Sequence, residues 1–365
     1  MLRWLWLLVL AGSVRAQPPG QKGIVRDEFI FTEAPFPSCH ASTIAATPTG
    51  LVAAWFGGTH EGSPDVCIWL SRRVGGQWTA PVRVADGIVR DSVDPATGRR
   101  DTLRYACYNP VLFQAPGGDL MLFYKVGSQV AAWKGYLKVS SDDGHTWSAA
   151  RALPAGFLGP VKNKPVLLAG GRLLCPSSTE KDGWRVHMEE TDPRGGTWWS
   201  TGPLNDGKSI QAIQPAILRY ADGRLQILCR SQQRAILTSW SGDQGKTWSV
   251  LAPTTLPNNN SGLDAVTLKD GRQLLVYNHV LPPPGQTSGE RSPLNVALSR
   301  DGVHWSAALV LEDDKAGEYS YPSVIQTADG MVHIVYTWRR QRIRYVEVDP
   351  ARLEEKGLPE EKAIK

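Results

Sequence analysis

The chain has 365 residues and a formal net charge of +5 at pH 7, and 42% of its residues are hydrophobic. Its positive charges are spread along the chain and form no Lys/Arg block, so we expect no nucleic-acid partner. The chain is rich in Gly (36), Pro (26) and Trp (14) and shows no long helical pattern, which favours an all-β protein.

The first sixteen residues have the pattern of an export signal. Arg3 precedes an apolar run from Trp4 to Ala11, and Val14-Arg15-Ala16 is a small-residue cleavage site. The apolar run is too short for a permanent membrane helix, and no later run approaches that length. We therefore expect cleavage after Ala16, a secreted or periplasmic location, and no stable membrane insertion.

Six pairs of short apolar runs follow in the chain, and a Gly-containing turn joins the two runs of each pair. The first runs begin at His40, Asn109, Lys164, Gln214, Asp264 and Tyr321. A short β-rich run, a Gly turn and a second such run are typical of a β-hairpin.

Between these hairpins, further strands lead into turns that end in Trp. Residues 140–147 and 241–248 fit the pattern S-x-D-x-G-x-T-W, residues 299–305 are one residue shorter, and residues 71–78 and 191–198 are degenerate copies. In such a turn we expect the Asp to accept backbone N–H bonds, the Gly to take a positive φ, and the Trp to pack beneath. The turn is therefore evidence about architecture and not about catalysis.

Six hairpins at intervals of about 50 to 70 residues, with outer strands between them, predict a six-bladed β-propeller. We assign residues 17–350 to this domain and residues 351–365 to a C-terminal tail, and we expect a monomer. Strand-like runs at Ile24 to Thr32 and Ile343 to Val348 lie near the two ends, so the N-terminal run is expected to complete the last blade. Residues 90–104 are predicted to be a long loop, either a cover for the pocket or a solvated connector.

The residue that starts the first strand of each blade is expected to point toward one mouth of the central channel. This register predicts a polar ring of His40, Asn109, Lys164, Gln214, Asp264 and Tyr321. Cations at nearby strand ends, namely Lys125, Lys162, Arg230, Arg291 and Arg339 or Arg340, are expected to converge on the same mouth. Arg binds a carboxylate bidentately, so the pocket suits an acidic ligand, while the alternative is that these bases are rim charges.

The five cysteines and the histidines do not predict a metal site. The number of cysteines is odd and no CxxC pair exists, so buried thiols are expected, with one bridge between two of Cys39, Cys67 and Cys107 left open. The remaining histidines are scattered without metal-ligand spacing. We predict no metal and no cofactor.

Several local motifs resemble those of the Asp-box (BNR-repeat) sialidases, and the resemblance covers nearly the whole mature chain. Cys229-Arg230-Ser231 resembles the motif of the second carboxylate-binding Arg, and the segment that begins at Arg291 resembles that of the third. The segment 318–323 is similar to the one with the nucleophilic Tyr and favours Tyr321 over Tyr319. The loop 57–69 resembles the one with the acid/base carboxylate, and its spacing favours Glu61, with Asp65 second.

Two positions depart from the sialidase pattern. His40 stands where the first Arg of the carboxylate-binding triad is expected, and Gln214 stands where a Glu assists the Tyr. An amide cannot accept the phenol proton, so Asp264 or Glu318 is left as a possible substitute for that Glu.

The resemblance implies a retaining exo-glycosidase acting on an acidic glycan with a terminal sugar acid, sialic acid or a relative. Tyr321 would attack the anomeric carbon, and Glu61 would protonate the leaving oxygen. Arg230 and Arg291 would bind the carboxylate, helped by His40 or Lys164. The remaining substrate-binding candidates are Asn109, Asp264 and Arg339.

Two other functions stay open. His40 and Tyr321 would act as base and acid on a uronic-acid-containing polysaccharide, by hydrolysis or β-elimination. Alternatively, the propeller binds an acidic carbohydrate without turnover.

Overall fold

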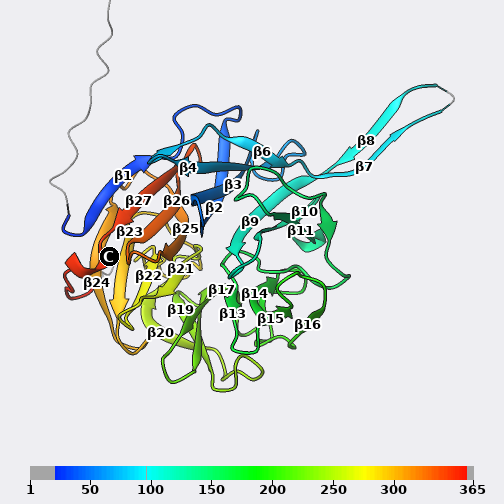
Figure 1. The fold of residues 1–365 in the computed structure, drawn as a ribbon. Coiled ribbons are helices and arrows are strands. Elements are labelled where there is room, and N and C mark those ends of the chain that lie inside the picture. The colour runs from blue at the N-terminus through cyan, green and yellow to red at the C-terminus, as the bar shows by residue number, and fades with distance from the viewer. Residues whose placement is uncertain (1–20, 96, 360–365) are drawn as a thin grey trace, which may run out of the picture.

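The computed structural model describes residues 21–95 and 97–359, and these residues form six β-sheets arranged around a central axis (Figure 1). The predicted six-bladed β-propeller is therefore confirmed. The predicted signal segment 1–16 and the last residues of the predicted tail, 360–365, lie outside the described residues.

Each blade is an antiparallel sheet of four strands, and the first blade carries a fifth. Blade 1 comprises β2 (Ser38–Thr47), β3 (Gly50–Gly58), β4 (Cys67–Val74) and β5 (Gln77–Trp78), and β6 (Val82–Ala85) also pairs with β4. Blade 2 comprises β9 (Ala106–Gln114), β10 (Leu120–Gly127), β11 (Lys134–Ser140) and β12 (Arg151–Ala152), with the short 3₁₀ helix η1 (Val130–Ala132) after β10. Blade 3 comprises β13 (Val166–Leu167), β14 (Leu173–Thr179), β15 (Arg185–Thr191) and β16 (Trp198–Ser200).

The remaining blades follow the same plan. Blade 4 comprises β17 (Ala212–Arg219), β18 (Leu225–Ser231), β19 (Ala235–Ser241) and β20 (Ala252–Pro257). Blade 5 comprises β21 (Asp264–Thr267), β22 (Gln273–Tyr277), β23 (Leu294–Ser299) and β24 (Trp305–Glu312). Blade 6 comprises β25 (Tyr319–Gln326), β26 (Val332–Trp338), β27 (Arg342–Val348) and β1 (Ile24–Phe29), and the 3₁₀ helix η2 (Pro350–Arg352) follows β27.

The N-terminal strand closes the ring, as the sequence predicts. Strand β1 pairs antiparallel with β27, from Ile24 opposite Val348 to Phe29 opposite Arg344. The segment after blade 6 is also held, because Lys356 pairs with Ala307 of blade 5 and the Leu353 side chain is buried. Both ends of the described chain thus pack on the propeller.

Apolar side chains fill the interfaces between neighbouring blades. One cluster joins blades 1 and 2 through residues such as Ile68 and Leu122, and another joins blades 5 and 6 through residues such as Val296 and Ile334. The other clusters occupy the remaining interfaces. The cysteines contribute to this packing, since all five are buried free thiols.

The Trp-containing turns have the hydrogen bonds expected of them. Asp142 Oδ1 accepts the Thr146 N–H at 2.8 Å, and Asp243 Oδ1 accepts the Thr247 N–H at 2.9 Å. Trp147 packs against the core between blades 1 and 2. These turns fix the outer strands and lie apart from the axis.

The segment 90–104 differs from the predicted loop. Strands β7 (Ile88–Val93) and β8 (Arg100–Arg104) form a two-stranded arm that projects away from the propeller (Figure 1). Cross-strand ion pairs support it: Arg90 contacts Asp101 at 2.8 Å, and Arg100 contacts Asp91. The prediction of a loop was wrong because opposite charges placed across a turn stabilise strand pairing.

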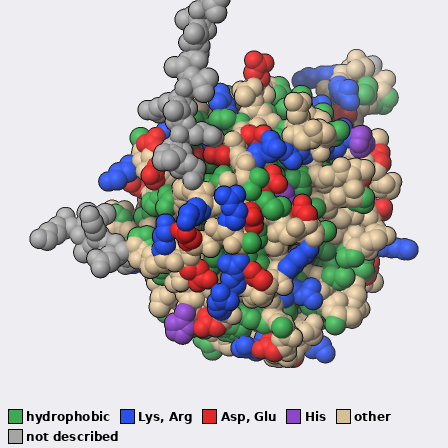
Figure 2. Space-filling model, turned by 60° about the vertical axis from the view of Figure 1, so that its left-hand side comes forward, with side chains coloured by type: hydrophobic (Ala, Val, Ile, Leu, Met, Phe, Trp, Pro, Cys, Tyr) green, Lys and Arg blue, Asp and Glu red, His purple; other side chains and the backbone are tan. Residues whose placement is uncertain are grey.

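The surface carries charges of both signs. On the face shown in Figure 2, basic and acidic side chains are interspersed. No helix among the described residues is long and apolar enough to cross a membrane.

Candidate active site

The first strands of four blades have a bulge at the position where the polar ring begins. Pairing register shifts at this point in blades 1, 2, 4 and 6. A residue beside each shift has a positive φ, namely Ala41, Asn109, Gln214 and Tyr321. A non-Gly residue in this conformation costs about 1–3 kcal/mol, and such strain collects at functional sites. The bulge also re-aims the side chains at the head of the strand.

Tyr321 lies at the centre of the site. Its phenol oxygen accepts a hydrogen bond from Arg230 Nη1 at 2.6 Å and one from the Gln214 amide nitrogen at 3.2 Å. Arg230 is held in turn by Asn260, whose side-chain oxygen accepts from Arg230 Nε at 2.8 Å. Because both groups donate to the phenol oxygen, negative charge that develops on this oxygen is stabilised.

Three cations surround the Tyr321 ring. The charged groups of Lys162, Arg230 and Arg291 lie 5.8, 5.8 and 5.7 Å from the ring centroid. Burial lowers the pKa of Lys162 to about 7, although the charge of Asp264 opposes this shift. With Arg340, described below, these residues form the cation cluster of the site.

His40 packs directly against Tyr321. The two ring centroids are 4.2 Å apart, and His40 Nδ1 is 3.0 Å from the Thr337 hydroxyl oxygen. Burial, followed by the charges of the cation cluster, with Arg340 the largest of these, holds the pKa of His40 well below its usual 6.5. The imidazole is therefore neutral at pH 7 and available as a proton acceptor.

Two glutamates connect the arginines at the mouth. Glu318 accepts from Arg291 at 2.9 Å and from Arg340 at 3.0 Å. Glu61 accepts from Arg340 at 2.7 Å, and its side chain is exposed. Asp65, the second candidate for the acid/base, instead accepts from the Thr59 N–H and hydroxyl and so stabilises its own loop. Of the two acids, Glu61 is the one within the network.

Lys164 and Asp264, in contrast, bind each other. Lys164 Nζ is 2.8 Å from the Asp264 carboxylate and also donates to the Ala265 carbonyl at 3.0 Å. The buried Asp264 carboxylate further accepts the backbone N–H of Val324 at 2.8 Å. These contacts link the inner strands of blades 5 and 6 to the segment before β13.

Two further predicted residues also make contacts away from Tyr321. The carbonyl of Asn109 accepts from the buried Lys125 at 3.4 Å. Arg339 contacts Asp314, and its guanidinium lies 3.5 Å from the Tyr319 hydroxyl. The structure therefore brings together Tyr321, His40, Gln214, Arg230, Arg291 and Glu61, whereas the hydrogen bonds and ion pairs of Lys164, Asp264 and Arg339 go to other partners than the Tyr321 oxygen.

Arg340 is the member of the cation cluster that sequence reasoning did not separate from its neighbour. Arg339 and Arg340 form the turn between β26 and β27, and both have positive φ values, 51° and 53°. Turns of this kind favour Asn-Gly, so two arginines there are strained. The Arg340 carbonyl accepts the Cys39 N–H at 2.8 Å, which places this turn beside His40. In the sequence, the one sign of this site was the placement of two arginines, Arg339 and Arg340, where a hairpin turn usually has small residues.

Comparison with known proteins gives the family. The family model for the BNR repeat-like domain matches residues 49–334. The chain belongs to this family. No curated protein matches the sequence.

Solved structures of the same fold include proteins of different activity. A protein of unknown function from Dyadobacter fermentans superimposes with a TM-score of 0.71 at 16% identity, covering 90% of this chain and 98% of the other. The intramolecular trans-sialidase of Ruminococcus gnavus gives 0.69 at 15% identity, with coverage of 93% and 100%. The α-L-arabinanase of Penicillium chrysogenum gives 0.63 at 16% identity, with coverage of 92% and 100%. This BNR-repeat protein therefore has the propeller fold of sialidase-like and arabinanase-like glycoside hydrolases.

Proposed function

We propose that the protein is an exo-acting glycosidase that removes a terminal acidic sugar, sialic acid or a relative, from an acidic glycan. The observation that carries this proposal is the environment of the Tyr321 phenol oxygen. It is bound by Arg230 within a cluster of three arginines and a buried lysine, with an exposed carboxylate at the mouth. Such a cluster suits a substrate with its own negative charge. The sialidase neighbours among the solved structures support the same class of substrate.

In this proposal, Arg230, Arg291 and Arg340 bind the substrate carboxylate. The position of the first-blade arginine of sialidases is occupied by His40, and Arg340 compensates by approaching His40 from the turn of the neighbouring sixth blade. Glu318 holds Arg291 and Arg340 by ion pairs and so fixes their spacing. A guanidinium binds a carboxylate through two parallel hydrogen bonds, which orients the sugar as well as binding it.

Tyr321 acts as the nucleophile without a neighbouring carboxylate. Among the described residues, the hydrogen bonds to its phenol oxygen come from Arg230 and Gln214, and both are donors. The site thus stabilises the charge of a phenolate directly, in place of a Glu that would accept its proton. A tyrosine nucleophile suits an acidic sugar, because a carboxylate nucleophile would be repelled by the substrate.

Glu61 supplies the proton for the leaving group. In the first step, the phenolate oxygen of Tyr321 bonds to the anomeric carbon while the bond to the glycosidic oxygen breaks and that oxygen leaves with the Glu61 proton, and the phenolate is regenerated in the second step. In the second step, Glu61 takes a proton from water, the water oxygen bonds to the anomeric carbon, and the bond to Tyr321 breaks. Binding of the substrate carboxylate to Arg340 releases Glu61 from its ion pair, so that the acid is freed when substrate is present.

One observation favours a second function, β-elimination on a uronic acid. His40 is neutral, packs against Tyr321 and lies within the cation cluster. In that reaction His40 removes the proton α to the carboxylate, the arginines stabilise the resulting charge, and Tyr321 protonates the leaving oxygen.

The test is turnover by purified protein of a panel of sialosides and uronic-acid glycosides. Release of the free sugar acid supports hydrolysis, whereas an unsaturated product that absorbs ultraviolet light supports elimination. Tyr321→Phe should lower either activity by at least about 10²-fold, and Glu61→Gln should lower only hydrolysis. Tyr319→Phe is the matched control, because Tyr319 is a buried tyrosine of the same strand whose hydroxyl contacts Arg339 instead of the cation cluster. Binding of an acidic glycan without turnover, unaffected by Tyr321→Phe, would overturn both functions and leave a carbohydrate-binding propeller.

A further inference from the structure

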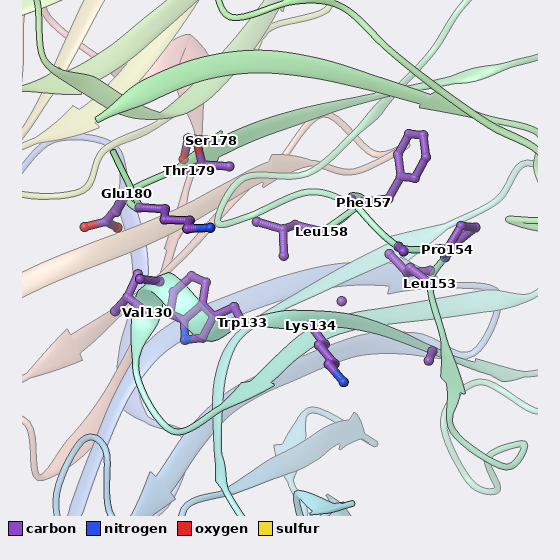
Figure 3. A pocket seen from close by; sticks show the side chains of 16 residues that line it. Val130, Trp133, Lys134, Leu153, Pro154, Phe157, Leu158, Ser178, Thr179 and Glu180 are labelled. Atoms are coloured by element: carbon purple, nitrogen blue, oxygen red, sulfur yellow. The ribbon is translucent and has the colours of Figure 1, made fainter. Parts of the chain in front are cut away.

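An apolar cavity of about 470 Å³ lies between blades 2 and 3. Its lining is mainly apolar, with Trp133, Leu153, Pro154, Phe157 and Leu158 among the apolar residues, and polar side chains such as Thr179, Glu180 and Lys181 line the remainder. Figure 3 shows Glu180 at the end of the cavity opposite Phe157 and Pro154. The volume matches that of a site for a small organic group.

The wall of the cavity is held in place by a buried acid behind it. Glu189 accepts the backbone N–H groups of Leu158 at 3.0 Å and Gly159 at 2.7 Å. Its carboxylate also accepts from the Ser177 hydroxyl at 3.1 Å. These bonds fix the loop that carries Phe157 and Leu158, so the cavity is formed before a ligand arrives.

One side of the cavity contacts residues that surround Tyr321. The Ser178 hydroxyl, in the cavity lining, accepts the backbone N–H of Gln214 at 3.1 Å, and Gln214 contacts Tyr321. Glu180 bonds to Trp184, and the Arg230 guanidinium lies 4.9 Å from the centroid of the Trp184 ring. Ser178 therefore contacts a residue that binds the phenol oxygen directly, and Glu180 is linked to another, Arg230, through Trp184.

The other side of the cavity approaches the candidate acid. Trp133 packs against Tyr108 with ring centroids 5.0 Å apart. Tyr108 in turn lies against the Glu61 loop: a Cβ added to Gly62 would be 3.6 Å from the Tyr108 hydroxyl oxygen. The lining of the cavity thus contacts a residue that binds the Tyr321 oxygen on one side and a residue packed against the Glu61 loop on the other.

We propose that this cavity binds the leaving group of the substrate and that this group is apolar, an aromatic or alkyl alcohol, rather than a second sugar. The assignment rests on the proposed glycosidase function, because the leaving group departs on the side of the acid. At the end of the cavity lined by Leu153, Pro154 and Phe157, the hydroxyls of a sugar would lose hydrogen bonds to water, whereas an apolar group gains free energy from burial.

The test compares benzyl and methyl glycosides of the sugar acid that the protein hydrolyses. Benzyl alcohol and methanol are similarly weak acids, so the ratio of kcat/KM between the two substrates measures binding of the leaving group and not its reactivity. We expect a benzyl preference of about tenfold or more. Leu158→Gln should reduce this preference severalfold, while Val250→Gln, at an exposed apolar residue elsewhere, should leave it unchanged.

A second measurement does not need turnover. In Tyr321→Phe, calorimetric binding of the benzyl glycoside should be tighter than that of the methyl glycoside, and Leu158→Gln added to this variant should remove the difference. Turnover of both glycosides without a benzyl preference would overturn the cavity assignment and leave the proposed function intact. Absence of turnover of any acidic glycoside would overturn the proposed function and this inference together.

Discussion

The polar ring around the axis divides into two parts that differ in what their side chains contact. His40, Gln214 and Tyr321 contact one another or the cation cluster at the mouth. Lys164 and Asp264 occupy equivalent positions in blades 3 and 5, yet they contact each other and backbone groups of neighbouring strands. Side chains of the same slot thus meet at the candidate site in some blades and link neighbouring strands in others. We call the linking residues, Lys164 and Asp264, the cohesive part of the ring.

The sharpest test of the division is removal of the phenol oxygen. Tyr321→Phe should lower kcat by about 10²–10⁴-fold, because the reacting oxygen and its bond to Arg230 are lost. The free energy of unfolding should change by less than about 1 kcal/mol, since the aromatic ring stays in the core. Steady-state kinetics and urea unfolding measure the two quantities. A full loss of folding with Tyr321→Phe would place this residue in the cohesive part.

The reverse pattern is expected for the Lys164–Asp264 pair. Asp264→Ala leaves Lys164 and the Val324 N–H without their partner, and breaking a buried pair in this way costs about 3–5 kcal/mol. Denaturant unfolding checks this value, and kcat per folded molecule should hold. Asp222→Ala, which breaks an exposed ion pair with Arg224, is the control and should cost about 1 kcal/mol or less. If Asp264→Ala lost turnover without losing stability, Asp264 would belong to the candidate active site and not to the cohesive part.

A smaller effect separates the two arginines of the β26–β27 turn. Arg340→Lys keeps the charge but loses the fork that binds a carboxylate, so KM for the acidic substrate should rise about 10- to 100-fold. Arg339→Lys, at the adjacent position with a similar φ, should change KM less than twofold because its contacts are Asp314 and Tyr319. Equal effects of the two substitutions would show that the turn, and not the Arg340 guanidinium, is what matters.

The buried Lys125, which donates to the backbone carbonyl of Asn109, should make the free energy of unfolding depend on pH. Burial lowers the pKa of Lys125 from 10.5 to about 7. Between these values the unfolded chain holds a proton that the folded chain lacks, so the free energy of unfolding rises with pH across this window. Lys125→Met should reduce that slope by at most about 1.4 kcal/mol per pH unit, measured by urea unfolding from pH 7 to 10. Lys246→Met, at an exposed position, should leave the slope unchanged.

Most of the fold was predictable because its signals are local. Each hairpin and each Trp-containing turn is specified within a few residues, and six copies reinforce one another. Ring closure by β1 also followed from a strand-like run near the N-terminus. The β7–β8 arm was missed because its strands are polar and exposed, and their pairing is supported by cross-strand ion pairs such as that of Arg90 with Asp101.

The site was predictable only where one short motif carried the information. Tyr321, Arg230 and Arg291 were identified from their segments and lie together in the structure. The sequence could not choose between Arg339 and Arg340, because contacts from Glu61 and Cys39 in blade 1 decide which of them faces His40. Nor could it show that Lys164 and Asp264 bind each other, since they are a hundred residues apart and meet across the axis.

The closure of blade 6 has a practical consequence for rearranging the chain. Near the N-terminal end of the described chain, Lys22 forms an ion pair with Glu354, 2.5 Å away, so residues 22 and 354 lie side by side. A short linker joining these neighbourhoods, with new ends opened at the tip of the β7–β8 arm, would make a circular permutant in which β1 follows β27 directly. Strand β1 would then be tethered at its start to the blade it completes, and fraying of that edge strand would no longer begin at a free chain end.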